Sequence, residues 1–219
     1  MGGILYLRGA PGLAEELQRK SLDISKKVSE AEPNNGMYQE FLSEGYYWLG
    51  FYSEKKLNLA RALQDYRNAL AGFGVLAVAD PKEVTAHRYE GICLTGIGRV
   101  LVAGGQEVRG LKSIENGLTL LEQITPSDRS ESVEKMENVA DAYRAIGVAY
   151  SSEATRRHVL HNLRVVRWKK ARAAYQKSLD VWLEVKARGA LTAFSPHEPE
   201  KIAGDVAKCD AALNRLKNP

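Results

Sequence analysis

The sequence predicts an all-α fold in which antiparallel helix pairs stack side by side as a solenoid. The first support is a set of glycines that recur at intervals of 48, 48 and 49 residues. Small residues follow the first three glycines after 12 positions, and leucines follow eight positions later. Because the three residue types recur in register, residues 1–219 are predicted to form one continuous repeat domain. The recurring positions are Gly2, Gly50, Gly98 and Gly147, then Ala14, Ala62 and Gly110, then Leu22, Leu70 and Leu118.

The first unit, residues 1–32, is expected to hold only part of a repeat. Gly2 already occupies the position that Gly50 holds late in the first helix of the next unit. One amphipathic helix is therefore predicted over residues 12–30. Its outer apolar face is expected to be covered by a second copy of the chain, as a homodimer contact, or by a displaced N-terminal segment. The apolar residues of this helix include Leu13, Leu22, Ile24 and Val28.

Two full units follow, residues 33–80 and 81–125, each with two predicted helices. In the first unit the apolar spacing favours helices over residues 36–52 and 57–78. In the second, Asp80-Pro81-Lys82-Glu83 offers an N-cap carboxylate, a proline for the first helical position and a capping-box glutamate. A helix is expected to begin there and to end at Gly104-Gly105. Its partner, predicted over residues 107–123, is expected to bury Val108, Leu111, Ile114, Leu118 and Leu121.

The last unit, residues 126–191, repeats this pattern around an insertion at residues 151–170. Thr125-Pro126-Ser127-Asp128 supplies a cap signal for its first helix. Apolar residues interleave with the basic residues of the insertion, which favours either an extended helix or a short extra one. Ser195-Pro196-His197-Glu198 then predicts a capping helix over residues 195–217, whose single apolar stripe suits the end of an array. That stripe consists of Ile202, Val206, Cys209, Leu213 and Leu216.

The composition is that of a folded protein without a membrane span. The apolar share is 44% and the charged share is 26%. No apolar run approaches the ~20 residues that a membrane helix needs. Cys93 and Cys209 lie in apolar stripes, as reduced core thiols do, so a cytoplasmic location is expected. The charge is uneven, since residues 1–150 carry 17 Lys and Arg against 20 Asp and Glu, and residues 151–219 carry 14 against 7.

The residues at the repeat positions resemble those of the tetratricopeptide repeat family. That resemblance implies a right-handed superhelix that acts as a protein-interaction module. The period of 48 residues departs from the family's usual length of about 34. In residues 171–182 and 188–191 this long variety is similar to the C-terminal arrays of certain bacterial serine/threonine protein kinases. The matching positions are Tyr46, Leu49, Gly50, Ala62, Tyr66, Ala69 and Leu70, and less completely Tyr143, Ile146, Gly147, Ala171, Tyr175 and Leu179.

The resemblance also implies a partner-binding groove, because the first helices of such arrays line the concave face. Each candidate taken singly is also compatible with ordinary surface or helix packing. Some family members bind the C-terminal carboxylate of heat-shock chaperones in this groove. Glu44 and Asp141 would repel such a carboxylate, so this role is not expected here. The projected groove residues are Glu44, Tyr47, Phe51, Glu54, Thr95, Arg99, Val102, Asp141, Arg144, Val148 and Ser151.

A second candidate region is the basic insertion, in which residues 156–172 contain no acid. One interpretation is a solvated helical face. The other is a site for an acidic or phosphorylated segment of a partner. Nucleic acid is disfavoured because the net charge is only +4. His158 and His161 lack the neighbouring ligands that a metal site requires. The basic candidates are Arg156, Arg157, Arg164, Arg167, Lys169 and Lys170.

Catalytic and cofactor motifs are missing from the sequence, including the glycine loop, His-Arg-Asp and Asp-Phe-Gly of protein kinases. We therefore expect no enzyme activity, cofactor, metal or membrane association. The expected function is binding of a peptide or protein segment, as a docking or regulatory part of a larger bacterial signalling protein. The alternatives are a free-standing scaffold or oligomerisation protein and, less favoured, a helical protein that binds a small molecule.

Overall fold

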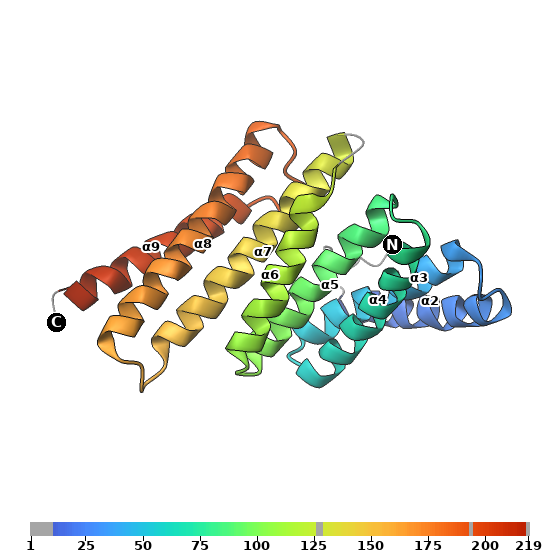
Figure 1. Cartoon of the computed structure of the whole chain (residues 1–219), viewed down its shortest axis with the longest axis horizontal. Helices are drawn as coiled ribbons and strands as arrows, with labels where there is room; N and C mark the ends of the chain where they lie inside the picture. Colours follow the sequence, from blue (N-terminus) through green and yellow to red (C-terminus); the bar gives the residue numbers. More distant parts are fainter. Residues whose placement is uncertain (1–10, 126–128, 193–194, 218–219) are drawn as a thin grey trace.

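The computed structural model describes residues 11–125, 129–192 and 195–217. Over these residues the protein is all-α, and its helices lie side by side in chain order from α2 at one end to α9 at the other (Figure 1). Gly2 and the cap signal expected at residues 126–128 lie outside the described residues. The eight described helices are α2 Pro11–Ala31, α3 Gly36–Lys55, α4 Leu59–Ala79, α5 Val84–Ala103, α6 Glu107–Gln123, α7 Arg129–Thr155, α8 His161–Ala187 and α9 Glu198–Lys217.

Each described helix packs against its neighbours in sequence, and the helices form sequential antiparallel pairs (Figure 1). The first helices of successive pairs also touch, α3 with α5 and α5 with α7. No comparable packing joins α4 with α6 or α6 with α8 among the described residues. The helices α3, α5 and α7 therefore share one face of a stacked helical array. This arrangement is consistent with the helical repeat that the sequence predicts.

The repeat glycines lie where paired helices approach most closely. A Cβ atom added to Gly98 would lie 2.4 Å from Cγ1 of Ile114 and 2.6 Å from the carbonyl oxygen of Gly110. At Gly50 and Gly147 it would lie 2.9 Å and 2.6 Å from the ring of Tyr66 or Tyr175 respectively. Any larger residue would push the two helices of a pair apart, which explains why the period is marked by glycine.

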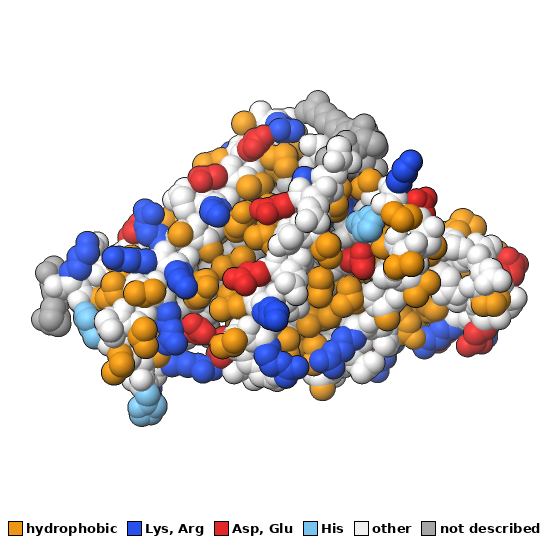
Figure 2. Space-filling model, in the orientation of Figure 1, with side chains coloured by type: hydrophobic (Ala, Val, Ile, Leu, Met, Phe, Trp, Pro, Cys, Tyr) orange, Lys and Arg blue, Asp and Glu red, His pale blue; other side chains and the backbone are white. Residues whose placement is uncertain are grey.

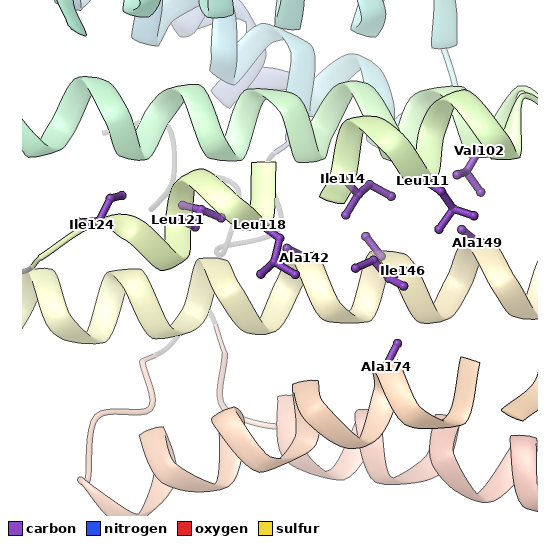
Figure 3. Packing of buried hydrophobic residues seen from close by; sticks show 11 residues of the cluster. Val102, Leu111, Ile114, Leu118, Leu121, Ile124, Ala142, Ile146, Ala149 and Ala174 are labelled. Carbon is purple, nitrogen blue, oxygen red and sulfur yellow. The ribbon is translucent and has the colours of Figure 1, made fainter. Parts of the chain in front are cut away.

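Apolar layers fill the space between the pairs. The cluster in Figure 3 joins α5 and α6 to α7, with Ala174 reaching it from α8. Ile114, Leu121 and Ala142 are fully buried there. A second cluster joins α7 and α8 to α9, and includes Ile202 and Cys209, of which Ile202 is fully buried and Cys209 is almost fully buried. The final helix thus covers the last apolar face of the array with one stripe, as its spacing predicts.

Two predicted helix starts are wrong by a few residues. The helix expected at Asp80 begins at Val84, and its N-cap is Glu83, whose carboxylate accepts from the backbone N–H groups of Thr85 and Ala86. Asp80 still closes α4, and its carboxylate accepts from Lys82 N at 3.0 Å in the connecting turn. The helix expected at Ser195 begins at Glu198. In both places the proline belongs to the turn before the helix.

The predicted burial of Val108 is also wrong, although the helix that carries it has the expected bounds, Glu107–Gln123. Val108 is 78% exposed. The buried stripe of α6 continues toward its start through Gly110, four residues before Ile114, and Glu107, four residues before Leu111. A carboxylate therefore occupies the inward position that an apolar residue was expected to fill.

The insertion lengthens two helices and adds no separate one. The helices α7 and α8 have 27 residues each and meet at a short loop, residues 156–160. The extended-helix alternative is therefore confirmed. Much of the added apolar surface remains in solvent, since Leu163 and Val166 are 44% and 47% exposed. No helix in the described part of the chain combines the length and the hydropathy that crossing a membrane requires.

Candidate functional site

The shared face of α3, α5 and α7 is hollowed by a cavity of about 440 Å³. Eight of the eleven residues that the sequence projects into a partner-binding groove line this one cavity. They come from three successive helix pairs, although they are up to about 100 positions apart in the chain. The eight are Tyr47, Phe51 and Glu54 from α3, Arg99 and Val102 from α5, and Asp141, Arg144 and Val148 from α7.

A second hollow of about 520 Å³ adjoins the first and extends it to the start of α9. Both are bordered by Tyr47, Phe51, Lys55, Asp141 and Arg144. We call the two hollows together the inner groove. The second hollow adds Trp48, Tyr52, Glu137, Asn138, Trp182, Ser195, Glu198 and Lys201 to its lining.

The other three projected residues take part in helix packing. Thr95 is 3% exposed, and its hydroxyl donates to Gly91 O at 3.0 Å. Glu44 lies in a separate hollow between α2 and α3, and accepts from the Tyr89 hydroxyl at 2.9 Å. The Ser151 hydroxyl lies 3.3 Å from that of Tyr175. The first hollow is therefore built mainly from the C-terminal halves of α3, α5 and α7.

A polar network lies at the base of the inner groove. Arg99 on α5 donates to both carboxylate oxygens of Glu54 on α3, at 2.8 Å each. The hydroxyl of Tyr66 on α4 donates to the same carboxylate at 2.7 Å. Burial raises the pKa of Glu54, but the charge and hydrogen bonds of Arg99 outweigh it, so the pKa lies below its ordinary value. The network ties the first two full helix pairs together.

Asp141 presents a carboxylate to the groove from α7. No hydrogen bond or ion pair within 4 Å engages it in the described part of the chain. Asp141 is exposed in the groove, but the surrounding protein partly desolvates its carboxyl group and raises its pKa, and the charge of Glu198 adds to this effect. Arg99 and Arg144 act in the opposite direction from a greater distance. The projected residue Asp141 is thus an anion without a close counter-ion.

Glu137 lies one helical turn before Asp141 and was not among the projected residues. It accepts from the hydroxyl of Ser195 at 3.1 Å. Burial raises the pKa of the Glu137 carboxyl, and the charges of Asp141 and Glu134 raise it further. The signal in the sequence was the spacing of four, which places Glu137 and Asp141 on one face of a helix.

An aromatic wall on α3 faces these carboxylates across the groove. Tyr47 packs edge-on against Trp48 with ring centroids 5.4 Å apart, and Trp48 packs against Phe51 at 5.8 Å. The ammonium group of Lys55 lies 5.1 Å from the centroid of the Phe51 ring. Burial raises the pKa of the Tyr47 hydroxyl. The sequence projection missed Trp48, although five of the seven residues from 46 to 52 are aromatic, which marks an unusual surface.

Trp182 on α8 lines the second hollow and carries a buried hydrogen-bond donor. Its side chain is only 2% exposed, and its indole N–H meets no acceptor in the residues that the structure describes. An indole nitrogen can only donate, so a buried one without an acceptor carries a free-energy cost. The projection missed this residue because it belongs to a second helix, which normally lies behind the groove.

The basic insertion lies at the end of α7, in the following loop and on α8, away from the inner groove. Arg156 pairs with Glu107, Arg164 donates to Ala154 O at 3.1 Å, and Arg167 pairs with Glu153 at 3.1 Å. Lys170 lies 5.0 Å from the ring centroid of Tyr150. Figure 2 shows Lys and Arg side chains gathered over the end of the array that carries α8 and α9. Arg157 and Lys169 are exposed and form no ion pair with a described residue.

The described residues contain no group of three His, Cys, Asp or Glu side chains arranged to hold a metal ion. A scan against protein-family models finds no match for this chain, and a search of curated proteins finds no relative. What the chain does must therefore be argued from its fold and from the inner groove.

Proposed function

We propose that this chain is a protein-interaction module that binds a peptide or an unstructured protein segment along the inner groove. The observation that carries the proposal is the convergence of eight projected residues, from three helix pairs, on one open hollow. A groove that crosses several helices offers an extended segment a continuous surface with aromatic anchors and polar groups. Repeat arrays bind partners in this way because their stacked units form long surfaces.

The finer assignment is that the array is a long tetratricopeptide-like repeat with a right-handed superhelix. It is supported by the glycines at the helix contacts, by Ala62 and Tyr66 at the family's positions, and by the capping helix α9. On the strength of the resemblance alone, we further propose a cytoplasmic docking or regulatory role in a bacterial signalling protein that carries a kinase domain.

A pair of exposed valines tests binding in the groove. Val148 lines the groove and is 44% exposed, whereas Val108 lies on α6 outside it and is 78% exposed. Short degenerate peptides are bound to the immobilised chain, and the selected peptides are measured by fluorescence anisotropy. Val148→Arg is expected to abolish their binding, and Val108→Arg is expected to leave it unchanged. Equal binding by both variants would remove the inner groove as the site.

A second candidate function, oligomerisation through α2, has its own supporting observation. Leu13 and Ile24 on α2 and Phe41 on α3 are 48%, 63% and 49% exposed. A hollow of about 650 Å³ between the two helices adjoins Ile24 and Phe41. Exposed apolar patches of this kind serve as contact surfaces between subunits. Size-exclusion chromatography with light scattering tests this oligomerisation, by comparing the native chain with Ile24→Lys over a range of concentrations. If both are monomers at every concentration, a homodimer through α2 is excluded.

The acidic or phosphorylated partner suggested by the basic insertion has weaker support. Arg156, Arg164 and Arg167 already bind groups of the protein itself. Arg157, Lys169 and Lys170 are the exposed bases of the insertion without a described ion pair, and Lys170 already lies over the Tyr150 ring. We therefore place the principal binding surface in the inner groove.

A further inference from the structure

The inner groove contains two carboxylates that the protein does not neutralise at close range. Glu137 and Asp141 lie one turn apart on α7 and line the same hollow. No described Lys, Arg or His forms an ion pair with either, and the hydroxyl of Ser195 is the hydrogen-bond donor to Glu137. Like charges at this spacing repel each other. The pair therefore favours a cation from outside the protein.

The basic side chains of the groove are held by other groups. Arg99 is bound at two points by Glu54, and Lys201 pairs with Glu198 at 2.6 Å. Arg144 lies between Glu198 and Asp205 with nitrogen to oxygen distances of 3.7 and 3.9 Å, which are ion-pair contacts without a hydrogen bond, and its buried Nε has no acceptor among the described residues. Lys55 lies over the Phe51 ring. Lys55 and Arg144 line the second hollow beside Asp141, and together with Arg99 they offset its charge from beyond ion-pair distance.

The wall opposite the two carboxylates suits a cation as well. The rings of Tyr47, Trp48 and Phe51 border the hollow that Glu137 and Asp141 line. The faces of aromatic rings attract ammonium and guanidinium groups within about 6 Å of the centroid. Lys55 already makes such a contact with Phe51 at 5.1 Å. A lysine or arginine side chain entering here would have carboxylates on one side and aromatic rings on the other.

The indole of Trp182 indicates what else the ligand carries. This nearly buried donor lines the same hollow and has no acceptor in the described chain. A ligand that brings an oxygen acceptor would satisfy it, and the carbonyl groups of a peptide backbone are such acceptors. A cationic side chain together with backbone carbonyls describes a basic peptide segment.

We propose that the second hollow of the inner groove binds a lysine or arginine side chain of the partner segment, between Glu137 and Asp141 on α7 and the aromatic wall of α3. This inference rests on the proposed function and specifies the chemistry of its ligand. An acidic or phosphorylated segment would meet the same two carboxylates and be repelled by them.

The experiment uses four pools of short degenerate peptides, each with one fixed central residue: arginine, its neutral analogue citrulline, glutamate or phosphoserine. Each pool is bound to the immobilised full chain, and the selected peptides are sequenced and titrated by fluorescence anisotropy. We expect the arginine pool to be retained best, and lysine or arginine to be enriched at free positions of the other pools. Preferred retention of the glutamate or phosphoserine pool overturns the inference.

Two isosteric variants test the residues themselves. Asp141→Asn and Glu137→Gln remove the charges with little change of shape, and circular dichroism and thermal melting check that both fold. We expect each to weaken the arginine peptides about tenfold and to leave the citrulline peptides unchanged. The control is Asp23→Asn, the same chemical change at an exposed position on α2 outside the groove. Binding that is unaltered in both groove variants contradicts the proposal.

The outcomes separate this inference from the proposed function. If peptides lose their binding in Val148→Arg but show no preference for a cation, the proposed function stands and the inference is overturned. If no pool binds the native chain more tightly than it binds Val148→Arg, both are overturned.

Discussion

Arg99 on α5 and Glu54 on α3 form a two-point ion pair at the base of the inner groove, with both nitrogen to oxygen distances at 2.8 Å. The two residues are 45 positions apart in the sequence and belong to successive helix pairs. Two parallel hydrogen bonds fix both the distance and the relative orientation of the two helices. The pair therefore sets the shape of the groove floor as well as its charge.

Breaking this pair is expected to destabilise the fold measurably. In Arg99→Lys the two-point contact is lost because an ammonium group cannot reproduce the planar fork of the guanidinium. We expect a loss of about 1.5–3 kcal/mol in the free energy of unfolding, the range for hydrogen bonds to charged groups. Urea denaturation measures it, and the double variant with Glu54→Gln isolates the coupling between the two residues. A coupling near zero would show that the contact is not maintained in solution.

The repeat glycines are expected to tolerate no side chain. Gly98→Ala places a methyl group 2.4 Å from Ile114 and 2.6 Å from a carbonyl oxygen, so α5 and α6 must separate. A loss of about 2 kcal/mol or more follows from overpacking of this kind. Gly204→Ala, in the interior of α9 with no atom within 4 Å of the new methyl group, is the control. It should raise stability by about 0.5–1 kcal/mol. Similar effects in the two variants would refute the helix-contact role.

Two neighbouring arginines of the basic insertion are expected to behave differently. Arg156 neutralises Glu107, which is 5% exposed, and also donates to Gly105 O at 3.3 Å. Arg156→Ala leaves that carboxylate without its counter-ion, and we expect a loss of about 1–3 kcal/mol. Arg157→Ala removes an exposed charge without a described ion pair, and should change stability by less than about 0.5 kcal/mol. Equal melting temperatures for the two variants would contradict a structural role for Arg156.

The pH dependence of the melting temperature is expected to depend on the protonation of Asp141, whose carboxylate has no close counter-ion. The pKa of its carboxyl group is raised in the folded chain, so the protonated carboxyl group favours folding. This contribution is fully present below the pKa of the unfolded chain and is lost as the pH rises through the pKa of the folded chain. At about pH 7 Asp141→Asn should therefore melt at a higher temperature than the native chain. The difference should disappear as the pH falls through the raised pKa, because the native carboxyl group is then neutral as well. A difference that is the same at about pH 7 and about pH 4 would argue against this origin.

The bound state is expected to have the opposite pH dependence. A cationic peptide needs Asp141 and Glu137 ionised, so its affinity should fall as both carboxyl groups take up protons. Because their pKa values are raised, the loss should begin above the ordinary titration range of carboxyl groups. Isothermal titration in buffers of different ionisation enthalpy measures the protons released on binding. Binding without proton release over this range would show that neither carboxylate contacts the ligand.

Much of the fold could be predicted from the sequence because the signals were local. The glycine pair at 104 and 105 ends one helix, and the apolar spacing of the next gives its bounds correctly as Glu107–Gln123. The helix starts at Val84 and Glu198 were harder to predict from the sequence. A carboxylate three residues after a possible cap can either complete a capping box or be the cap itself, and the preceding turn decides between them.

The groove could be predicted only in part because its polar contacts are made between repeats. Projection from single helices placed Asp141 and Arg144 correctly on the face that the groove uses, but could not show that Arg99 would be bound by Glu54. A signal was present: Glu54 and Arg99, like Glu44 and Tyr89, are separated by 45 residues, the repeat period less one turn of helix. Trp182 carried no such signal, because it enters the groove from a second helix and only the packing of α8 and α9 reveals it.

The most direct test of binding in the inner groove is ¹⁹F NMR of the chain labelled with 5-fluorotryptophan. The chain has three tryptophans: Trp48 and Trp182 line the groove, and Trp168 lies on α8 within the basic insertion. A peptide selected from the arginine pool is titrated in, and the three signals are assigned from single Trp→Phe variants. We predict that the signals of Trp48 and Trp182 shift in proportion to binding while that of Trp168 stays constant. A shift of Trp168 alone would place the partner on the basic insertion and contradict the groove as the binding site.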